Sequence, residues 1–361
     1  MNFFFEIIVV ILGTYLAFTN YLADKITGWF PTEGNIVIVN EETGNQSDLL
    51  PSLPTTFSNI PDILIKSQEY QAATVIDSEP NYTINDPILA LVNIYCTFTT
   101  NDTIRTTTGT GFFVHSDGVI LTNAHVAQYL LLEKTNLLGE AECVVRTGNP
   151  ATAKYQADLL YIPPAWMQKN IDSIKSLAPT GTGERDYALL YVSESINKEP
   201  LPARFPALAL NTKLMPRTMK NREVQAAGYP ATDLLKNGAS SPLLPVSATT
   251  TISELYTFGS NYADVFSIRG TNVGAEGSSG GPVLNSSGEV VGVIVTRSND
   301  KVDGKGSLRA ITASHIDRTI KEETGFSLDK NISGDFAHRS EIFSRTVTPF
   351  LLGLLTLKLS N

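Results

Sequence analysis

Residues 277–282 have the sequence Gly-Ser-Ser-Gly-Gly-Pro, and a valine-rich, strand-like stretch follows them at 289–296. A serine hydroxyl is a weak nucleophile, so catalysis needs a base beside it and hydrogen-bond donors directed at the developing oxyanion. Glycine lets the backbone take the tight conformation that turns the N–H groups of Gly277 and Ser279 toward one point. The run makes Ser279 a candidate nucleophile, although on its own it also fits a glycine-serine surface turn.

A candidate base and a candidate acid lie upstream, each at the end of a predicted strand. His125 ends the stretch Leu-Thr-Asn-Ala-His and begins a helix-like segment. The chain's other histidines, none of which has this setting, are His115, His315 and His338. Asp186 directly precedes the apolar strand at 187–192. A carboxylate at the edge of a buried strand needs a hydrogen-bond partner, and the imidazole N–H of His125 is a suitable one.

The sequence around these motifs predicts an all-β domain from about Ile88 to Gly325. Short runs rich in β-branched and aromatic residues alternate there with glycine, asparagine and aspartate turns. The predicted strands include 109–114, 118–123, 142–147, 187–192, 223–229, 282–285 and 289–296. A helix at 314–323 is expected to close the domain.

Taken in order, Thr-Asn-Ala-His, Asp-Tyr-Ala-Leu-Leu and Gly-x-Ser-Gly-Gly-Pro resemble the three catalytic blocks of trypsin-like serine proteases, in particular those of the bacterial high-temperature-requirement (HtrA/Deg) type. The resemblance implies two six-stranded antiparallel barrels and a serine endopeptidase that uses neither a cofactor nor a metal. The implied triad is His125, Asp186 and Ser279. The implied oxyanion hole consists of the N–H groups of Gly277 and Ser279.

The resemblance also implies a substrate pocket and a disulfide. The implied pocket residues are Val273, Gly274, Val295, Thr296 and Arg297. None of these is acidic, so we expect a small or medium apolar residue before the scissile bond (P1) and not Lys or Arg. From the residues alone, the two cysteines are either buried thiols or a pair. The implied topology makes the strands of Cys96 and Cys143 neighbours and favours the pair.

Two departures from the family pattern change what is expected. Digestive members carry an acid before the nucleophile that pairs with a newly cut amino terminus, but this chain has Ser278 there. Activation by that route is therefore not expected. Residues 326–361 are too few for the PDZ domain that commonly follows a high-temperature-requirement protease domain, so none is expected.

The first residues predict attachment to a membrane. Residues 3–23 carry one charge, Glu6, over about the length a helix needs to cross a hydrocarbon core of roughly 30 Å. An uncleaved anchor is favoured, with a cleaved signal peptide or a buried amphipathic helix as alternatives. The protease domain would then be extracytoplasmic and membrane-anchored, or secreted if residues 3–23 are removed.

The remaining segments complete the predicted organisation. Residues 1–26 form the anchor or signal-like segment, and 27–87 form a linker rich in proline, asparagine and threonine. The protease domain covers 88–325, and 326–361 form a tail. The apolar stretch at 347–357 is too short to span a bilayer and is expected to dock on the domain or lie at a membrane surface.

Charge and composition narrow the function. The 27 Lys and Arg against 36 Asp and Glu are dispersed along the chain and make no basic cluster, so nucleic acid is not an expected partner. We expect protein or peptide substrates, with a role in protein quality control or processing at a membrane. No oligomeric state is indicated. The rival functions are a catalytically silent, protease-like binding domain and an α/β-hydrolase esterase with a Gly-x-Ser-x-Gly elbow.

Overall fold

The computed structural model describes residues 72–74, 81–99, 104–135, 139–171, 174, 183–232, 234, 241–259, 261–298 and 300–359. All of them belong to one compact unit, Leu49–Asn361. The predicted anchor at residues 3–23 and most of the predicted linker lie outside the described residues. Among the helices that the structure describes, none has both the length and the apolarity needed to cross a membrane.

Six strands close the first barrel. They are β2 (Leu91–Thr99), β3 (Ile104–His115), β4 (Val119–Thr122), β5 (Glu140–Thr147), β6 (Thr152–Tyr161) and β7 (Ala188–Ser195). Antiparallel hydrogen bonds join them in the order β2-β3-β4-β7-β6-β5. Alternate side chains of a strand face opposite sides of its sheet, and in the second half of β2 this buries Ile94, Cys96 and Phe98 in the core.

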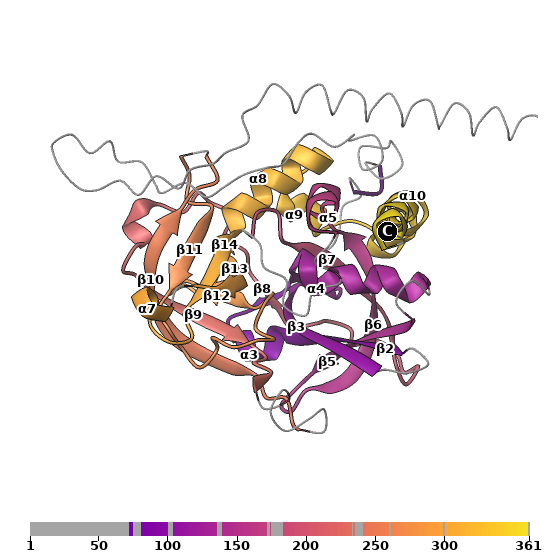
Figure 1. Ribbon diagram of the computed structural model, residues 1–361, viewed down its shortest axis with the longest axis horizontal. Helices are drawn as coiled ribbons and strands as arrows, with labels where there is room; N and C mark the ends of the chain where they lie inside the picture. Colours follow the sequence, from indigo (N-terminus) through magenta and orange to yellow (C-terminus); the bar gives the residue numbers. More distant parts are fainter. Residues whose placement is uncertain are drawn as a thin grey trace, which may run out of the picture. The chain divides into compact units, whose positions relative to one another are not determined.

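A second set of six strands closes the second barrel. They are β9 (Glu223–Gly228), β10 (Val246–Tyr256), β11 (Val265–Ile268), β12 (Pro282–Leu284), β13 (Val290–Arg297) and β14 (Leu308–Thr312). Their order is β10-β11-β14-β13-β12-β9, again antiparallel throughout. The two closed barrels confirm the predicted fold (Figure 1). They contradict the α/β-hydrolase alternative, which needs a mostly parallel sheet.

Part of the predicted linker takes part in the domain. Strand β1 (Thr83–Ile84) pairs in parallel with β8 (Ala207–Leu208). The turn of helix that follows, α3 (Pro87–Ala90), is capped by Asp86, whose Oδ1 accepts from the Ile88 N–H at 2.9 Å. The ordered structure therefore begins before residue 88. The sequence allowed for one or two local strands or a short helix in the linker. It did not predict the pairing with the domain, because a two-residue strand carries no periodic signal.

Short helices fill the connections between strands. They are α4 (Ala124–Ala127), the 3₁₀ helix η1 (Gln128–Lys134), α5 (Pro164–Asn170), the 3₁₀ turn η3 (Arg217–Met219) and α7 (Asp300–Asp303). The domain-closing helix α8 spans Ala313–Thr324, within one residue of the prediction at each end. It begins where the Thr312 hydroxyl accepts from the His315 N–H and ends at Gly325, whose φ is 84°. A left-handed glycine is a common helix stop because it has no Cβ to clash.

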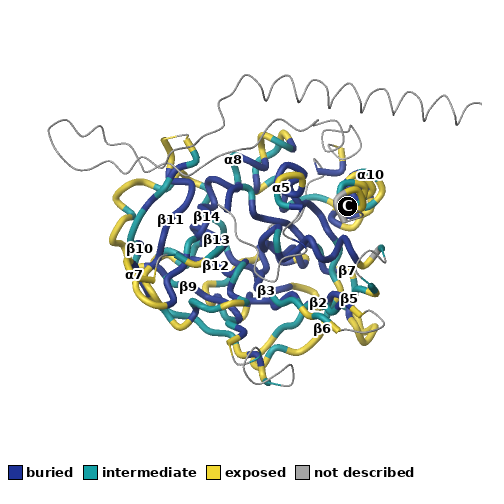
Figure 2. The backbone as a smooth tube through the Cα atoms, viewed as in Figure 1, coloured by how far each residue is buried: buried dark blue, intermediate teal, exposed yellow. Residues whose placement is uncertain are grey.

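The tail forms α9 (Leu328–Asn331) and a long helix, α10 (Phe336–Leu359). Phe343, Val347, Leu351 and Leu355 recur every four residues on one face of α10 and are fully buried. They join the main hydrophobic core, and α10 packs against β6 and β7 of the first barrel. Figure 2 shows the buried residues gathered in the interior of the domain. Of the two expected positions for the apolar stretch, docking on the domain is the one observed. Its eleven residues are the end of a 24-residue amphipathic helix.

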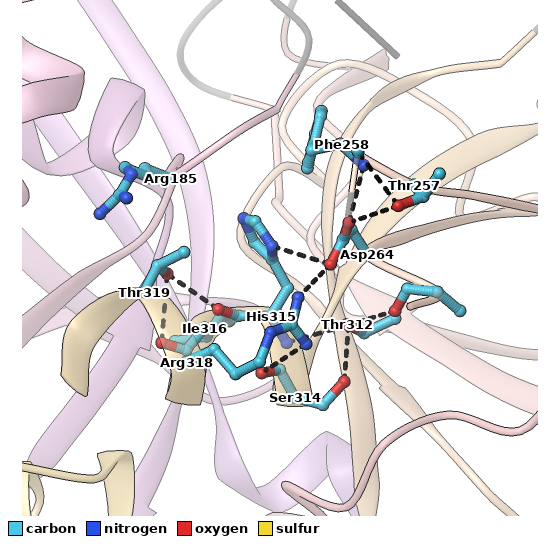
Figure 3. Close-up of polar contacts among 12 residues, drawn as sticks. Arg185, Thr257, Phe258, Asp264, Thr312, Ser314, His315, Ile316, Arg318 and Thr319 are labelled. Carbon is cyan, nitrogen blue, oxygen red and sulfur yellow. Dashed lines mark hydrogen bonds and ion pairs between the residues drawn. The ribbon is translucent and has the colours of Figure 1, made fainter. Parts of the chain in front are cut away.

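A buried carboxylate fastens α8 to the second barrel (Figure 3). Asp264 lies just before β11 with a side chain that is 1% exposed. Its Oδ2 accepts from the Phe258 N–H at 2.7 Å and from the Thr257 hydroxyl at 3.1 Å. Its Oδ1 meets Nδ1 of His315 at 3.2 Å and accepts from the Arg318 guanidinium, both on α8. One carboxylate thus links the β10–β11 turn to the first turns of the helix.

Candidate active site

His125 lies on the first turn after β4, where the chain changes from strand to helix. Asn123 has an extended backbone, and its carbonyl accepts from the N–H groups of Val126 and Ala127 at 3.2 and 3.0 Å. This begins α4 and places His125 as its second residue. The Asn123 side chain donates to the Asp186 carbonyl at 2.8 Å, so the same turn is tied to the segment before β7 that carries the acid.

Asp186 holds His125 through both carboxylate oxygens. Oδ1 accepts from the His125 backbone N–H at 2.9 Å, and Oδ2 lies 2.7 Å from ring atom Nδ1. The side chains are 9% and 16% exposed for Asp186 and His125. Because an ionised carboxylate can only accept, the neutral imidazole carries its proton on Nδ1. Nε2 is left with a lone pair, as a general base requires.

Arg185 ties the segment before Asp186 to helix α8. Its backbone has a φ of 56°, in the left-handed region that side chains rarely adopt. Its guanidinium pairs with Glu322 at 2.8 Å and also with Glu323. The two ion pairs, made from a mostly buried guanidinium, keep the segment in this uncommon conformation. The acid therefore approaches the histidine from a fixed direction.

The peptide between Glu276 and Gly277 has its carbonyl turned toward the second barrel. The Glu276 oxygen accepts from the Ala231 N–H at 2.7 Å. In a trans peptide the C=O and N–H point in opposite directions, so the Gly277 N–H faces away from Ala231. Gly277 has a φ of +91°, and a Cβ there would lie 2.7 Å from the Tyr229 carbonyl oxygen. Only glycine fits this position without displacing backbone.

The peptide between Ser278 and Ser279 is oriented in the same way. The Ser278 carbonyl accepts from the Gly281 N–H at 3.0 Å, which turns the Ser279 N–H the other way. Within the described part of the chain, the N–H groups of Gly277 and Ser279 donate to no carbonyl. Two neighbouring N–H groups held in this manner match the donors an oxyanion hole needs.

A cleft of about 360 Å³ brings these groups together. His125 and Val126 lie on one part of its lining, and Gly277 and Ser279 lie on another. The other lining residues are Ile94, Cys96, Arg105, Thr106, Thr107, Thr108, Tyr129, Ala275, Glu276, Val295, Thr296, Arg297 and Leu308. The structure therefore gathers the predicted base and nucleophile, far apart in sequence, into one cavity.

The predicted pocket residues divide into two sets. Val295, Thr296 and Arg297, at the end of β13, line the cleft. Val273 is fully buried in the core of the second barrel and is absent from the lining. Gly274 is also absent, because it lies against the backbone of Gly306, whose oxygen would be 1.8 Å from a Cβ at Gly274.

Reasoning from sequence did not place Leu308 or Cys96 in the cleft lining, although the pairing of Cys96 with Cys143 was among its expectations. Leu308, directly opposite Arg297 in the β13–β14 ladder, is a cleft residue that only the strand register reveals. Cys96 and Cys143 face each other in the β2–β5 ladder and form a disulfide with an S–S distance of 2.07 Å. This is the pairing that the resemblance implied, and Cys96 also lines the cleft.

Two closed antiparallel barrels and a cleft lined by a histidine and a serine are the features of the double-barrel class of peptidases. The model of the trypsin-like peptidase domain matches residues 109–293, just over half of the chain. The chain belongs to this family.

Comparison with individual proteins adds one structural likeness. The crystal structure of the Rv3671c protease from M. tuberculosis in its active form is similar to this chain, with 17% sequence identity and a TM-score of 0.38. The match covers 80% of this chain and 96% of that one. No curated protein matches the sequence.

Proposed function

We propose that this peptidase is a serine endopeptidase in which Ser279 attacks the scissile carbonyl. His125 takes the Ser279 proton on Nε2 and later gives it to the leaving amine. Asp186 keeps the imidazole proton on Nδ1 and stabilises the imidazolium formed in the transition state. The observation that carries the proposal is the pair of hydrogen bonds that Asp186 accepts from the backbone N–H and Nδ1 of His125, whose side chain lines the same cleft as Ser279.

The N–H groups of Gly277 and Ser279 are the proposed oxyanion hole. Their orientation follows from the carbonyls of Glu276 and Ser278, which are held by hydrogen bonds on the opposite side. Donors fixed before the reaction need no reorganisation when the carbonyl oxygen becomes negative. Each donor of this kind contributes about 10²–10³-fold to kcat.

Ser278 supports activity without a cut amino terminus. It is fully buried, and its hydroxyl donates to the Val273 carbonyl. This buried bond fixes the loop around Ser279. In digestive members of the family, an acid at the position of Ser278 fixes the same loop by pairing with the newly cut amino terminus. We therefore propose that the oxyanion loop is formed in the uncut chain.

Covalent labelling tests the proposed nucleophile. The folded protein is incubated with a fluorophosphonate probe, and the modified peptide is sequenced by mass spectrometry. We expect a single adduct on Ser279, none on the adjacent Ser278, and none in a Ser279→Ala control. A folded protein that forms no adduct would instead fit the catalytically silent binding domain.

The cleft supports a preference for small or medium apolar P1 residues. Val295 and Leu308 offer apolar walls to the cleft. Among the lining residues the one carboxylate is Glu276, which is exposed and next to the oxyanion loop.

We expect cleavage after Ala, Val or Leu to exceed cleavage after Lys or Arg by about 10–100-fold in kcat/KM, the range that pocket contacts supply. A peptide library with varied P1 residues measures the ratio. The Leu308→Ala variant is expected to move the optimum toward larger apolar residues. Efficient cleavage after Lys or Arg would contradict the apolar pocket.

The cellular setting is proposed from the sequence. Residues 3–23 lie outside the described residues, and their length and apolarity support a membrane anchor. An anchored endopeptidase with an apolar pocket suits protein quality control or processing at a membrane, because unfolded chains expose apolar residues. The domain would then be extracytoplasmic, or secreted if the segment is removed.

A further inference from the structure

Thr110 connects the first barrel to the loop that carries Ser279. It lies in β3 and is fully buried. Its backbone N–H donates to the Ser279 carbonyl at 2.8 Å, and its hydroxyl donates to the Gly277 carbonyl at 2.6 Å. A single residue thus holds both of the residues whose N–H groups form the proposed oxyanion hole.

Each of the four consecutive carbonyls of this loop, from Glu276 to Ser279, accepts a hydrogen bond, and every second donor belongs to Thr110. Those of Glu276 and Ser278 accept from N–H groups of the second barrel and of the loop itself. Those of Gly277 and Ser279 accept from Thr110 alone among the described contacts. Removing the Thr110 hydroxyl would leave the peptide between the two proposed oxyanion donors held only by its own N–H, that of Ser278, which donates to the Ala275 carbonyl at 3.3 Å.

The direction of the hydroxyl proton is set by a second bond. The Tyr229 N–H, at the end of β9, donates to Oγ1 of Thr110 at 2.9 Å. Because an N–H can only donate, the hydroxyl must direct its own proton to the Gly277 carbonyl. The Thr110 carbonyl accepts from the Thr122 hydroxyl at 2.7 Å, so every polar group of Thr110 is used.

The loop also approaches Thr110 so closely that no side chain could intervene. A Cβ on Gly280 would lie 1.9 Å from the Thr110 carbonyl oxygen, and Gly280 has a φ of +89°. The loop therefore rests directly on the backbone of β3. Its register against the first barrel, which carries His125, is set at this contact.

We propose that Thr110 is a positioning residue that keeps the N–H groups of Gly277 and Ser279 directed at the oxyanion, an inference that rests on the proposed endopeptidase function. Thr110→Val keeps the shape of the side chain but leaves the Tyr229 N–H and the Gly277 carbonyl buried without a partner. The peptide then keeps only the longer bond from the Ser278 N–H to the Ala275 carbonyl, so its orientation is less restricted. Transition-state stabilisation falls, whereas substrate binding along the cleft does not.

The test measures kcat and KM on a peptide substrate for the wild type, Thr110→Val and Thr110→Ser. We expect Thr110→Val to lower kcat by about 10²-fold with little change in KM, and Thr110→Ser to restore most of it. Thr250→Val is the matched control, since Thr250 lies in β10, is buried and donates its hydroxyl to the Arg269 carbonyl at 2.9 Å. It loses a comparable bond away from the cleft and should keep the wild-type kcat.

Several outcomes would overturn the positioning role. These are a wild-type kcat in folded Thr110→Val, a loss confined to KM, or an equal loss in Thr250→Val. If Thr110→Val does not fold, Thr110→Cys replaces it, because a thiol fills the position but donates weakly. A kcat for Thr110→Cys equal to that of Thr110→Ser would then contradict the role. An unlabelled, inactive wild type would instead contradict the proposed function itself.

Discussion

Replacing Ser279 with alanine is expected to lower kcat for peptide hydrolysis by about 10⁶-fold, and adding His125→Ala to the same chain should lower it very little further. The two side chains act as one unit. The imidazole has no proton to take once the hydroxyl is gone, and the hydroxyl has no base once the imidazole is gone. Steady-state kinetics on one peptide substrate for wild type, both single variants and the double variant measures this.

The residual rate is informative in its own right. The N–H groups of Gly277 and Ser279 belong to the backbone and survive in Ser279→Ala, so catalysis of about 10³-fold over water should persist. KM should stay close to the wild-type value because the cleft lining is unchanged. Strictly multiplicative losses from Ser279→Ala and His125→Ala would contradict the triad, as would a single variant that retains most of the activity.

Asp264→Asn is expected to lower the free energy of unfolding by about 3–5 kcal/mol at pH 7. The carboxylate is 1% exposed and joins the β10–β11 turn to His315 and Arg318 on α8. An amide of the same size leaves the guanidinium without its counter-charge next to the barrel. Urea denaturation of both proteins measures the difference.

The effect should depend on pH in a defined direction. Burial alone would raise the pKa of Asp264, but the hydrogen bond with His315, the Phe258 N–H and the Arg318 charge outweigh burial and hold the pKa below its ordinary value. A carboxylate with a lowered pKa in the folded state adds stability above its unfolded pKa of about 3.9, and this stability is lost as the pH falls below that value. The difference between wild type and Asp264→Asn should therefore shrink below about pH 4.

A matched substitution tests whether the loss of stability comes from burial of the carboxylate or only from a histidine beside it. Asp117 also lies beside a buried histidine, His115, at 3.6 Å, but its side chain is 51% exposed. Asp117→Asn should cost about 0–1 kcal/mol, because an exposed pair gains little over its hydration. Equal losses in the two variants would argue against the buried network as the source of the effect.

The predicted base, acid and nucleophile could be located from sequence because each is part of a local motif. His125 and Asp186 stand at strand ends, where a side chain can leave the sheet and meet a partner. Ser279 stands in a glycine run whose backbone conformations exclude other residues. The strands could be predicted for a similar reason. Successive side chains of a strand point to opposite faces of its sheet, so apolar residues recur at alternate positions.

Features made of distant segments were missed or misplaced. Val273 and Gly274 were expected in the pocket, but neither lines the cleft, and Val273 is buried in the core of the second barrel. The β13–β14 register places Leu308 in the lining. The tail was interpreted as an eleven-residue apolar stretch because the buried positions of α10 before Val347 are separated by polar residues. Its length becomes clear only when the helix is seen against the first barrel.

The sequence by itself predicted an all-β domain and the candidates His125, Asp186 and Ser279, because strand periodicity and glycine conformation are local properties. The two barrels were implied by the resemblance of the three motifs to a known family. The tertiary structure alone decided which groups share the cleft and how the loop around Ser279 is held. Thr110 shows the reason. It is one of several threonines in β3, and its proposed role rests on its contacts with Gly277, 167 residues away in sequence, and with Ser279. Contacts between residues so far apart in the sequence depend on how the two closed barrels pack together, and no local sequence pattern predicts that packing.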